Sequence, residues 1–211
     1  NQGVFHSCLL PEISGAVRRA QQMFSGLPVH LAGFSLVGNC LRRGAADAPR
    51  AGLDIASVVA ISPVLEPSAT LAAMQDCGMP LLVPSPRDFE TLMASCMAKP
   101  PFFPYSLKHV MARRAVADYG LHCAIMRELL DSPMLRVAIE TPALIVWGTE
   151  DRILSPKGAA ATRALMPDAR LIMMEGIGHL PMLEATRRTA RDFLDFQLTL
   201  DGQSGQKREC A

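Results

Sequence analysis

Largely apolar runs and segments of helical periodicity alternate along this chain. A short apolar run bounded by turn residues indicates a strand that is covered on both faces, as in a parallel sheet. Such runs predict strands at 29–32, 58–61, 143–147 and 169–174. Apolar positions three and four residues apart predict helices at 13–24, 36–46, 156–166 and 183–198. The alternation predicts an α/β fold with a mostly parallel sheet flanked by helices.

The middle of the chain has a different composition. Between residues 67 and 140 methionine and proline are frequent, which predicts short helices interrupted by prolines. One interpretation is an inserted helical cap over an apolar pocket; the other is that the methionines pack the interior of the cap itself. The predicted divisions are a core segment 1–66, a cap 67–140, a second core segment 141–200 and a disordered polar tail 201–211.

Three polar positions inside these elements are expected to be structural. His30 is predicted to be a packed residue of the first strand, because no partner for its ring is evident nearby. Arg42 and Arg43 are predicted to lie on the solvated face of the helix at 36–46.

Composition and charge exclude several classes of function. The 211 residues carry a formal net charge of +1, so no nucleic-acid partner is predicted. No apolar run reaches the ~20 residues of a membrane span, so no transmembrane segment is predicted. The six cysteines include no Cys-x-x-Cys pair, which favours a reducing compartment and a cytoplasmic location. The five histidines lack the spacing of zinc ligands, so neither a metal nor another cofactor is expected.

Ser35 lies where the strand at 29–32 gives way to a helix. A tight strand–serine–helix turn projects the serine hydroxyl above the edge of the sheet. The free N–H of the following residue, Leu36, would then be a donor for an oxyanion formed at the serine. The structural alternative is a serine that only caps the helix. The turn predicts a candidate nucleophile at Ser35.

Two polar turns downstream extend this pattern. Asp151 follows the strand at 143–147, and His179 follows the strand at 169–174. Because parallel strands bring their carboxyl ends to one edge of the sheet, both side chains are expected to converge with Ser35. Serine, then acid, then histidine is the order of an α/β-hydrolase triad, in which the histidine is the base and the acid orients it. Taken singly, Asp151 and His179 are also explained as ordinary loop residues, and Glu150 is a rival for the acid.

Several segments resemble the α/β-hydrolase superfamily. Residues 141–154 (TPALIVWGTEDRIL) look like its acid-bearing segment, and residues 176–184 (GIGHLPMLE) look like its histidine segment. Residues 85–90 and 99–102 are similar to the cap of monoacylglycerol-lipase-like and esterase members. The turn at 33–39 (GFSLVGN) is similar to a Gly-Phe-Ser-Leu-Gly-Gly-Asn elbow of another branch. The resemblance implies a partial α/β-hydrolase fold with an inserted helical cap.

The same resemblance implies a serine hydrolase that cleaves small-molecule carboxylic esters. Ser35 would be the nucleophile that forms an acyl-enzyme, Asp151 the acid and His179 the base, on an esterase- or lipase-like substrate with a lipophilic acyl chain. The alternatives are a carbon–carbon bond hydrolase on the same triad and a truncated or degenerate hydrolase fold without catalysis.

Two departures from the family pattern favour the non-catalytic alternative. Val37 occupies the place of the second elbow glycine, where a β-branched side chain is expected to crowd the turn. The strands and the His-Gly oxyanion loop that open family members have no counterpart before Ser35, and His6 is not followed by glycine. The chain is therefore expected to be the carboxyl-terminal portion of such a hydrolase.

Overall fold

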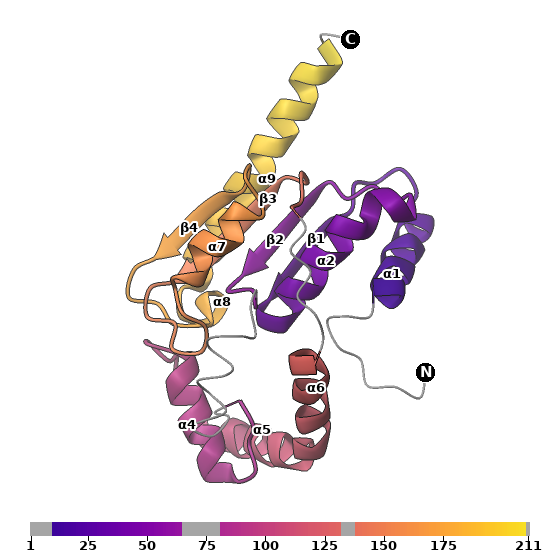
Figure 1. Ribbon diagram of the computed structural model, residues 1–211. Coiled ribbons are helices and arrows are strands. Elements are labelled where there is room, and N and C mark those ends of the chain that lie inside the picture. Colours follow the sequence, from indigo (N-terminus) through magenta and orange to yellow (C-terminus); the bar gives the residue numbers. More distant parts are fainter. Residues whose placement is uncertain (1–9, 65–80, 132–137, 210–211) are drawn as a thin grey trace.

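The computed structural model describes residues 10–64, 81–131 and 138–209, and its sheet is parallel throughout. The four strands lie side by side in the order of the sequence (Figure 1). They are β1 (His30–Phe34), β2 (Ser57–Ile61), β3 (Ala143–Gly148) and β4 (Arg170–Met174). The helices are α1 (Leu10–Met23), α2 (Ser35–Ala51), α4 (Pro86–Cys96), α5 (Tyr105–Ala117), α6 (Tyr119–Asp131), α7 (Gly158–Ala164), α8 (Pro181–Glu184) and α9 (Thr186–Glu209). The predicted α/β architecture is confirmed.

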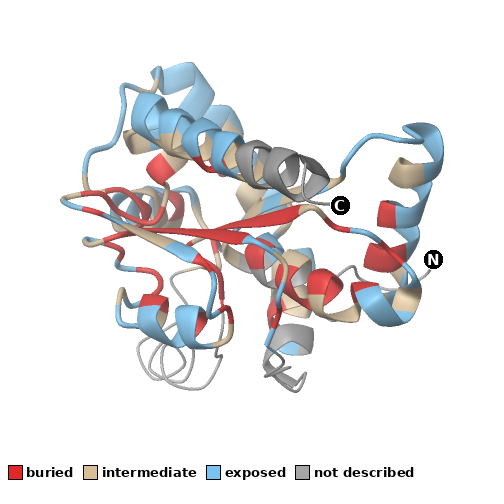
Figure 2. Cartoon of the chain, turned by 90° about the horizontal axis from the view of Figure 1, so that it is seen from above, coloured by how far each residue is buried: buried red, intermediate tan, exposed pale blue. Residues whose placement is uncertain are grey.

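Helices cover both faces of the central strands (Figure 2). On one face Ile145 of β3 belongs to a buried cluster with Ala48 of α2 and Ala159 of α7. On the other face Leu144, the preceding residue of β3, packs in a cluster with Phe196 of α9. Successive strand residues point to opposite faces, and all six residues of β3 are buried. The apolar run at 143–147 is therefore sandwiched between helices, as its composition predicts.

The first strand differs from its prediction. β1 lies at the edge of the sheet, and its residues alternate between exposed and half-buried. His30 is exposed, and its Nδ1 lies 2.8 Å from the hydroxyl of Ser57. The expectation that β1 is buried on both faces, with His30 packed and without a partner, is wrong. The physical reason is that β1 pairs only with β2 in the described part of the chain.

The two arginines of α2 also differ from prediction. Arg42 is fully buried and Arg43 is 7% exposed, so neither side chain is solvated. α2 packs against α1, β1 and β2, which leaves little of its surface open. Burial lowers the pKa of Arg42 to about 10, with a further contribution from the charge on Arg43. The rule that charged helix positions face water fails here because α2 has neighbours on several sides.

Between β2 and β3 the described residues form the helices α4, α5 and α6, which lie beyond the carboxyl ends of the strands (Figure 1). The hydroxyl of Ser85 accepts the N–H of Asp88 at the start of α4, and Pro86 follows the cap position. Met93 and Met111 pack against a separate buried cluster in the inserted segment, as expected if methionines fill the interior of the cap, whereas Met97 and Met126 belong to the main core cluster. The expected helical insertion is present, while residues 67–80 and 132–137 of the predicted cap lie outside the described residues.

The carboxyl-terminal helix is longer than expected. α9 continues through residues 201–209, where a disordered tail is predicted from the polar composition. The glutamines, lysine and arginine of this stretch are good helix formers, and they offset Gly202 and Gly205. Figure 1 shows this end of α9 projecting away from the sheet. No helix in the described ranges combines the length and the apolar character that a membrane crossing requires.

Candidate active site

The turn between β1 and α2 contains Ser35. β1 ends at Phe34 and α2 begins at the next residue, so strand and helix meet without a loop. Ser35 has a φ of 51°, in the left-handed region that residues other than glycine rarely adopt. Its backbone carbonyl accepts the N–H of Val64 at 3.2 Å. Strain of this kind is concentrated at functional sites, and here it gives the sharp turn expected of a nucleophile elbow.

Val37 is accommodated within this turn. A Cβ atom on Gly33 would lie 2.8 Å from Cγ1 of Val37, so the missing side chain at Gly33 makes the space that Val37 uses. A Cβ atom on Gly38 would lie 3.0 Å from Cβ of Pro63, so Gly38 makes the close approach to the chain after β2. The turn therefore has room for Val37 although its second glycine comes one residue late.

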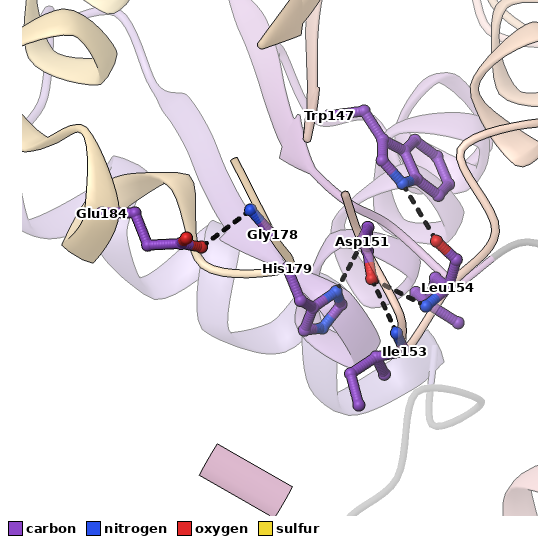
Figure 3. Close-up of polar contacts among 7 residues, drawn as sticks. All are labelled: Trp147, Asp151, Ile153, Leu154, Gly178, His179 and Glu184. Carbon is purple, nitrogen blue, oxygen red and sulfur yellow. Dashed lines mark hydrogen bonds and ion pairs between the residues drawn. The ribbon is translucent and has the colours of Figure 1, made fainter. Parts of the chain in front are cut away.

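Asp151 lies in the polar turn that follows β3, and Figure 3 shows its hydrogen bonds. Its side chain is buried, and Oδ1 accepts the backbone N–H groups of Ile153 at 2.9 Å and Leu154 at 2.8 Å. The indole N–H of Trp147 donates to the carbonyl of Leu154 at 3.3 Å and steadies the same turn. One carboxylate oxygen is thus held by the backbone, and the other is directed to a different partner.

That partner is His179, in the loop between β4 and α8. Its Nδ1 lies 2.8 Å from Oδ2 of Asp151, and both side chains are buried (Figure 3). A carboxylate only accepts hydrogen bonds, so the proton of the neutral ring is assigned to Nδ1, and Nε2 remains as an acceptor. Glu150 is exposed and contacts this loop through its backbone N–H, which donates to Ile177 at 2.9 Å. The geometry favours Asp151 over Glu150 as the acid.

The elbow and the histidine are neighbours. The ring of Phe34, the residue before Ser35, packs edge-on against the ring of His179 with centroids 6.3 Å apart. No hydrogen bond joins the Ser35 hydroxyl to the His179 ring among the described residues. Such bonds are often long in enzymes without substrate and shorten in the reacting complex. Leu36 is the second residue of α2, where backbone N–H groups have no partner within the helix.

The loop that carries His179 is packed tightly on both sides. A Cβ atom on Gly148 would lie 2.1 Å from the carbonyl oxygen of Gly178 and 2.2 Å from that of Ile177. On the other side the His179 N–H donates to the carbonyl of Cys96 at 2.7 Å. Burial, together with the nearby carboxylates of Asp151 and Glu184, raises the pKa of the Cys96 thiol to about 11.

Sequence reasoning assigned no role to Glu184, the last residue of the quoted histidine segment. Its carboxylate accepts the N–H of Gly178 at 2.9 Å (Figure 3). An acidic side chain shortly after a glycine-flanked histidine was the available signal. Across the ranges 10–64, 81–131 and 138–209, no group of three or more histidine, cysteine or acidic side chains could hold a metal ion.

Comparison with known proteins agrees with the α/β fold described above and indicates a class of protein. Residues 9–192 match the Alpha/beta hydrolase family. Over 129 residues the chain is 35% identical to Lipase 1 of Psychrobacter immobilis, covering 59% of this chain and 41% of the lipase. Over 123 residues it is 34% identical to Lipase 3 of Moraxella sp. (strain TA144), covering 56% of this chain and 39% of that lipase. The matched part therefore spans less than half the length of either relative.

A solved structure supports the assignment. The crystal structure of a membrane phospholipase A, a bacterial virulence factor, superposes with a TM-score of 0.81 at 27% identity, covering 95% of this chain and 65% of that chain. The profile match extends over most of the present sequence, including the segments that carry Ser35, Asp151 and His179. This chain belongs to the alpha/beta hydrolase family.

Proposed function

We propose that this protein is a serine hydrolase that cleaves carboxylic esters through an acyl-enzyme on Ser35. The observation that carries the proposal is the buried hydrogen bond of 2.8 Å between His179 and Asp151, beside the turn that contains Ser35. A serine hydroxyl is a weak nucleophile until a base takes its proton, and an oriented neutral imidazole is such a base.

In the proposed reaction, Nε2 of His179 takes the hydroxyl proton as Oγ of Ser35 bonds to the ester carbonyl carbon. The carbonyl oxygen becomes an oxyanion, for which the N–H of Leu36 is the candidate donor. His179 then protonates the departing alkoxide, and the acyl group stays on Ser35. A water molecule loses a proton to His179 and attacks the acyl carbon. The acid leaves as His179 returns that proton to Ser35.

The role of Asp151 is to hold the imidazole in one tautomer and to stabilise the imidazolium that forms in both half-reactions. Its second oxygen is held by the N–H groups of Ile153 and Leu154, so the carboxylate cannot rotate away without breaking two hydrogen bonds. Restraint of this kind is how a supporting group keeps a base in its reactive position.

We infer a lipophilic acyl chain for the substrate. Two relatives that are 35% and 34% identical over their matched segments are named lipases. Pocket-lining side chains would come from the inserted helices, which lie beyond the strand ends where Ser35 and His179 are found.

The test is covalent labelling of the 211-residue chain with a fluorophosphonate, which reacts with activated serines. We expect labelling of the parent and none of Ser35→Ala. Asp151→Asn favours the wrong tautomer of His179, and its labelling rate is expected to fall by about 10³-fold or more. His109→Ala is the control, because His109 lies on α5, where its ring stacks on Tyr105.

Folded parent protein that is not labelled would contradict the proposal and favour the non-catalytic alternative. For the acyl chain, kcat/KM on p-nitrophenyl esters is expected to rise from butanoate to dodecanoate. A fall along that series would refute the lipophilic assignment. A carbon–carbon hydrolase, the other alternative, would be labelled, but its kcat/KM on these esters would stay low along the whole series.

A further inference from the structure

The carboxylate of Glu184 lies between two backbone N–H groups that are distant in the sequence. Oε1 accepts the N–H of Gly178, the residue before His179, at 2.9 Å. Oε2 accepts the N–H of Lys99, just beyond α4 in the inserted segment, at 2.7 Å. One carboxylate therefore joins the loop of the candidate base to the inserted segment.

A third hydrogen bond joins the same two segments. The N–H of His179 donates to the carbonyl of Cys96, the last residue of α4, at 2.7 Å. Their backbones are in close contact, because a Cβ atom on Gly178 would lie 2.7 Å from that carbonyl oxygen and 2.8 Å from the nitrogen of Ala98. The end of α4 is thus joined to the histidine loop at two consecutive residues of that loop, Gly178 and His179.

We propose that Glu184 is a positioning residue that couples the end of α4 to His179. It acts through the backbone of Gly178, which precedes His179, and through that of Lys99, beyond α4. This inference rests on the proposed function, because it assigns His179 the role of base. By this coupling, a displacement of the end of α4 moves the backbone of the base.

The chemistry of the pair of hydrogen bonds requires a carboxylate. Each N–H needs an acceptor, and an ionised glutamate supplies one oxygen to each. The amide of Glu184→Gln has a single acceptor oxygen, and its NH₂ group would face the other N–H, donor against donor. Whichever way the amide turns, either Gly178 or Lys99 loses its partner.

The experiment compares Glu184→Gln with Glu175→Gln in the full 211-residue chain. Glu175 is an exposed residue of the loop between β4 and α8, and so provides the same chemical change nearby. Three quantities are measured: kcat and KM on a p-nitrophenyl ester, hydrogen exchange of the Gly178 and Lys99 amides, and the downfield proton signal of the His179 Nδ1–H bonded to Asp151.

We expect Glu184→Gln to lower kcat by roughly tenfold to a hundredfold, the loss typical of a hydrogen bond to a charged group, with KM within about twofold. Exchange of the Gly178 or Lys99 amide should rise, and the Nδ1 proton signal should broaden or disappear. Glu175→Gln should match the parent in all three measurements. A purely structural role would lower the amount of folded enzyme but leave kcat per folded molecule and the Nδ1 signal unchanged.

The inference is overturned if Glu184→Gln keeps the parent's kcat and Nδ1 signal. If the variant does not fold, the parent decides: Gly178 and Lys99 amides that exchange as fast as exposed amides would overturn the inference, and protection of both supports it. A parent that hydrolyses no ester contradicts the proposed function alone, because the exchange rates and the Nδ1 signal still decide whether Glu184 holds the base.

Discussion

Gly148, the last residue of β3, is predicted to be essential for the position of His179. In Gly148→Ala the new methyl carbon would lie 2.1 Å from the carbonyl oxygen of Gly178 and 2.2 Å from that of Ile177. Both atoms belong to backbone, which cannot rotate away as a flexible side chain can. The histidine loop must therefore move as a whole, and it carries His179 with it.

The size of the movement follows from ordinary contact distances. A carbon and a carbonyl oxygen that are not bonded approach to about 3.3 Å, so the loop must retreat by about 1 Å. The bond of 2.8 Å between His179 and Asp151 cannot absorb such a shift and remain a hydrogen bond. Overpacking of this kind costs about 1–3 kcal/mol of stability, and a misplacement of about 1 Å at a catalytic group can cost roughly a hundredfold in rate.

The assay pairs the rate of fluorophosphonate labelling with the midpoint of thermal unfolding, and labelling is measured well below that midpoint. Gly120→Ala is the control, because a Cβ atom at Gly120 in α6 would meet no atom within 4 Å. We expect Gly148→Ala to label about a hundredfold more slowly and to unfold about 2–12 °C lower. Parent-like labelling and an unchanged midpoint in Gly148→Ala would refute the argument from close contact.

Two predictions concern stability rather than catalysis. Ser62 is fully buried with a φ of 41°, and its hydroxyl finds no hydrogen-bond partner within the described residues, so Ser62→Gly should stabilise the fold by about 1 kcal/mol in urea unfolding. Ser57→Gly, which removes the hydroxyl bonded to His30, should instead destabilise it; equal effects would contradict this reasoning. The raised pKa of Cys96 means that the thiol proton is held more tightly in the folded state than in the unfolded state, in which the pKa of the thiol is near 9.0. The contribution of this proton to the free energy of unfolding is present below pH 9 and is lost as the pH rises to about 11. The loss is about 2–3 kcal/mol, and Cys96→Ala should not show it. Equal alkaline losses in parent and variant would show that the thiol does not matter.

The sequence predicts much of the fold because the central strands have unambiguous patterns. The run at 143–147 is apolar on both faces, and β3 is indeed buried along its whole length. The run at 29–32 has a similar composition, yet β1 is an edge strand. An apolar run is compatible with burial on both faces, but it does not determine which strands and helices pack beside it. The burial of Arg42 was missed for the same reason, since it depends on the elements packed around α2.

The candidate site was also predictable from the sequence only in part. The order of Ser35, Asp151 and His179 along the chain, each after a parallel strand, was enough to predict a common edge of the sheet. The meeting of Asp151 and His179 confirms that part of the reasoning. Glu184 could not be assigned, because its partners are backbone N–H groups, which every residue except proline possesses. Only the folded chain shows that one of them belongs to the inserted segment.

The contacts of the histidine loop also suggest an order of assembly during folding. Asp151 and His179 are 28 residues apart in the chain, whereas Lys99 and Glu184 are 85 apart. Closing the longer loop costs about 1 kcal/mol more in chain entropy, and contacts of longer range form more slowly. We therefore expect the acid–histidine pair to form early, within the contiguous unit from β3 to α8. The contact with α4 would follow, so the base would gain its final alignment in one of the last steps of folding.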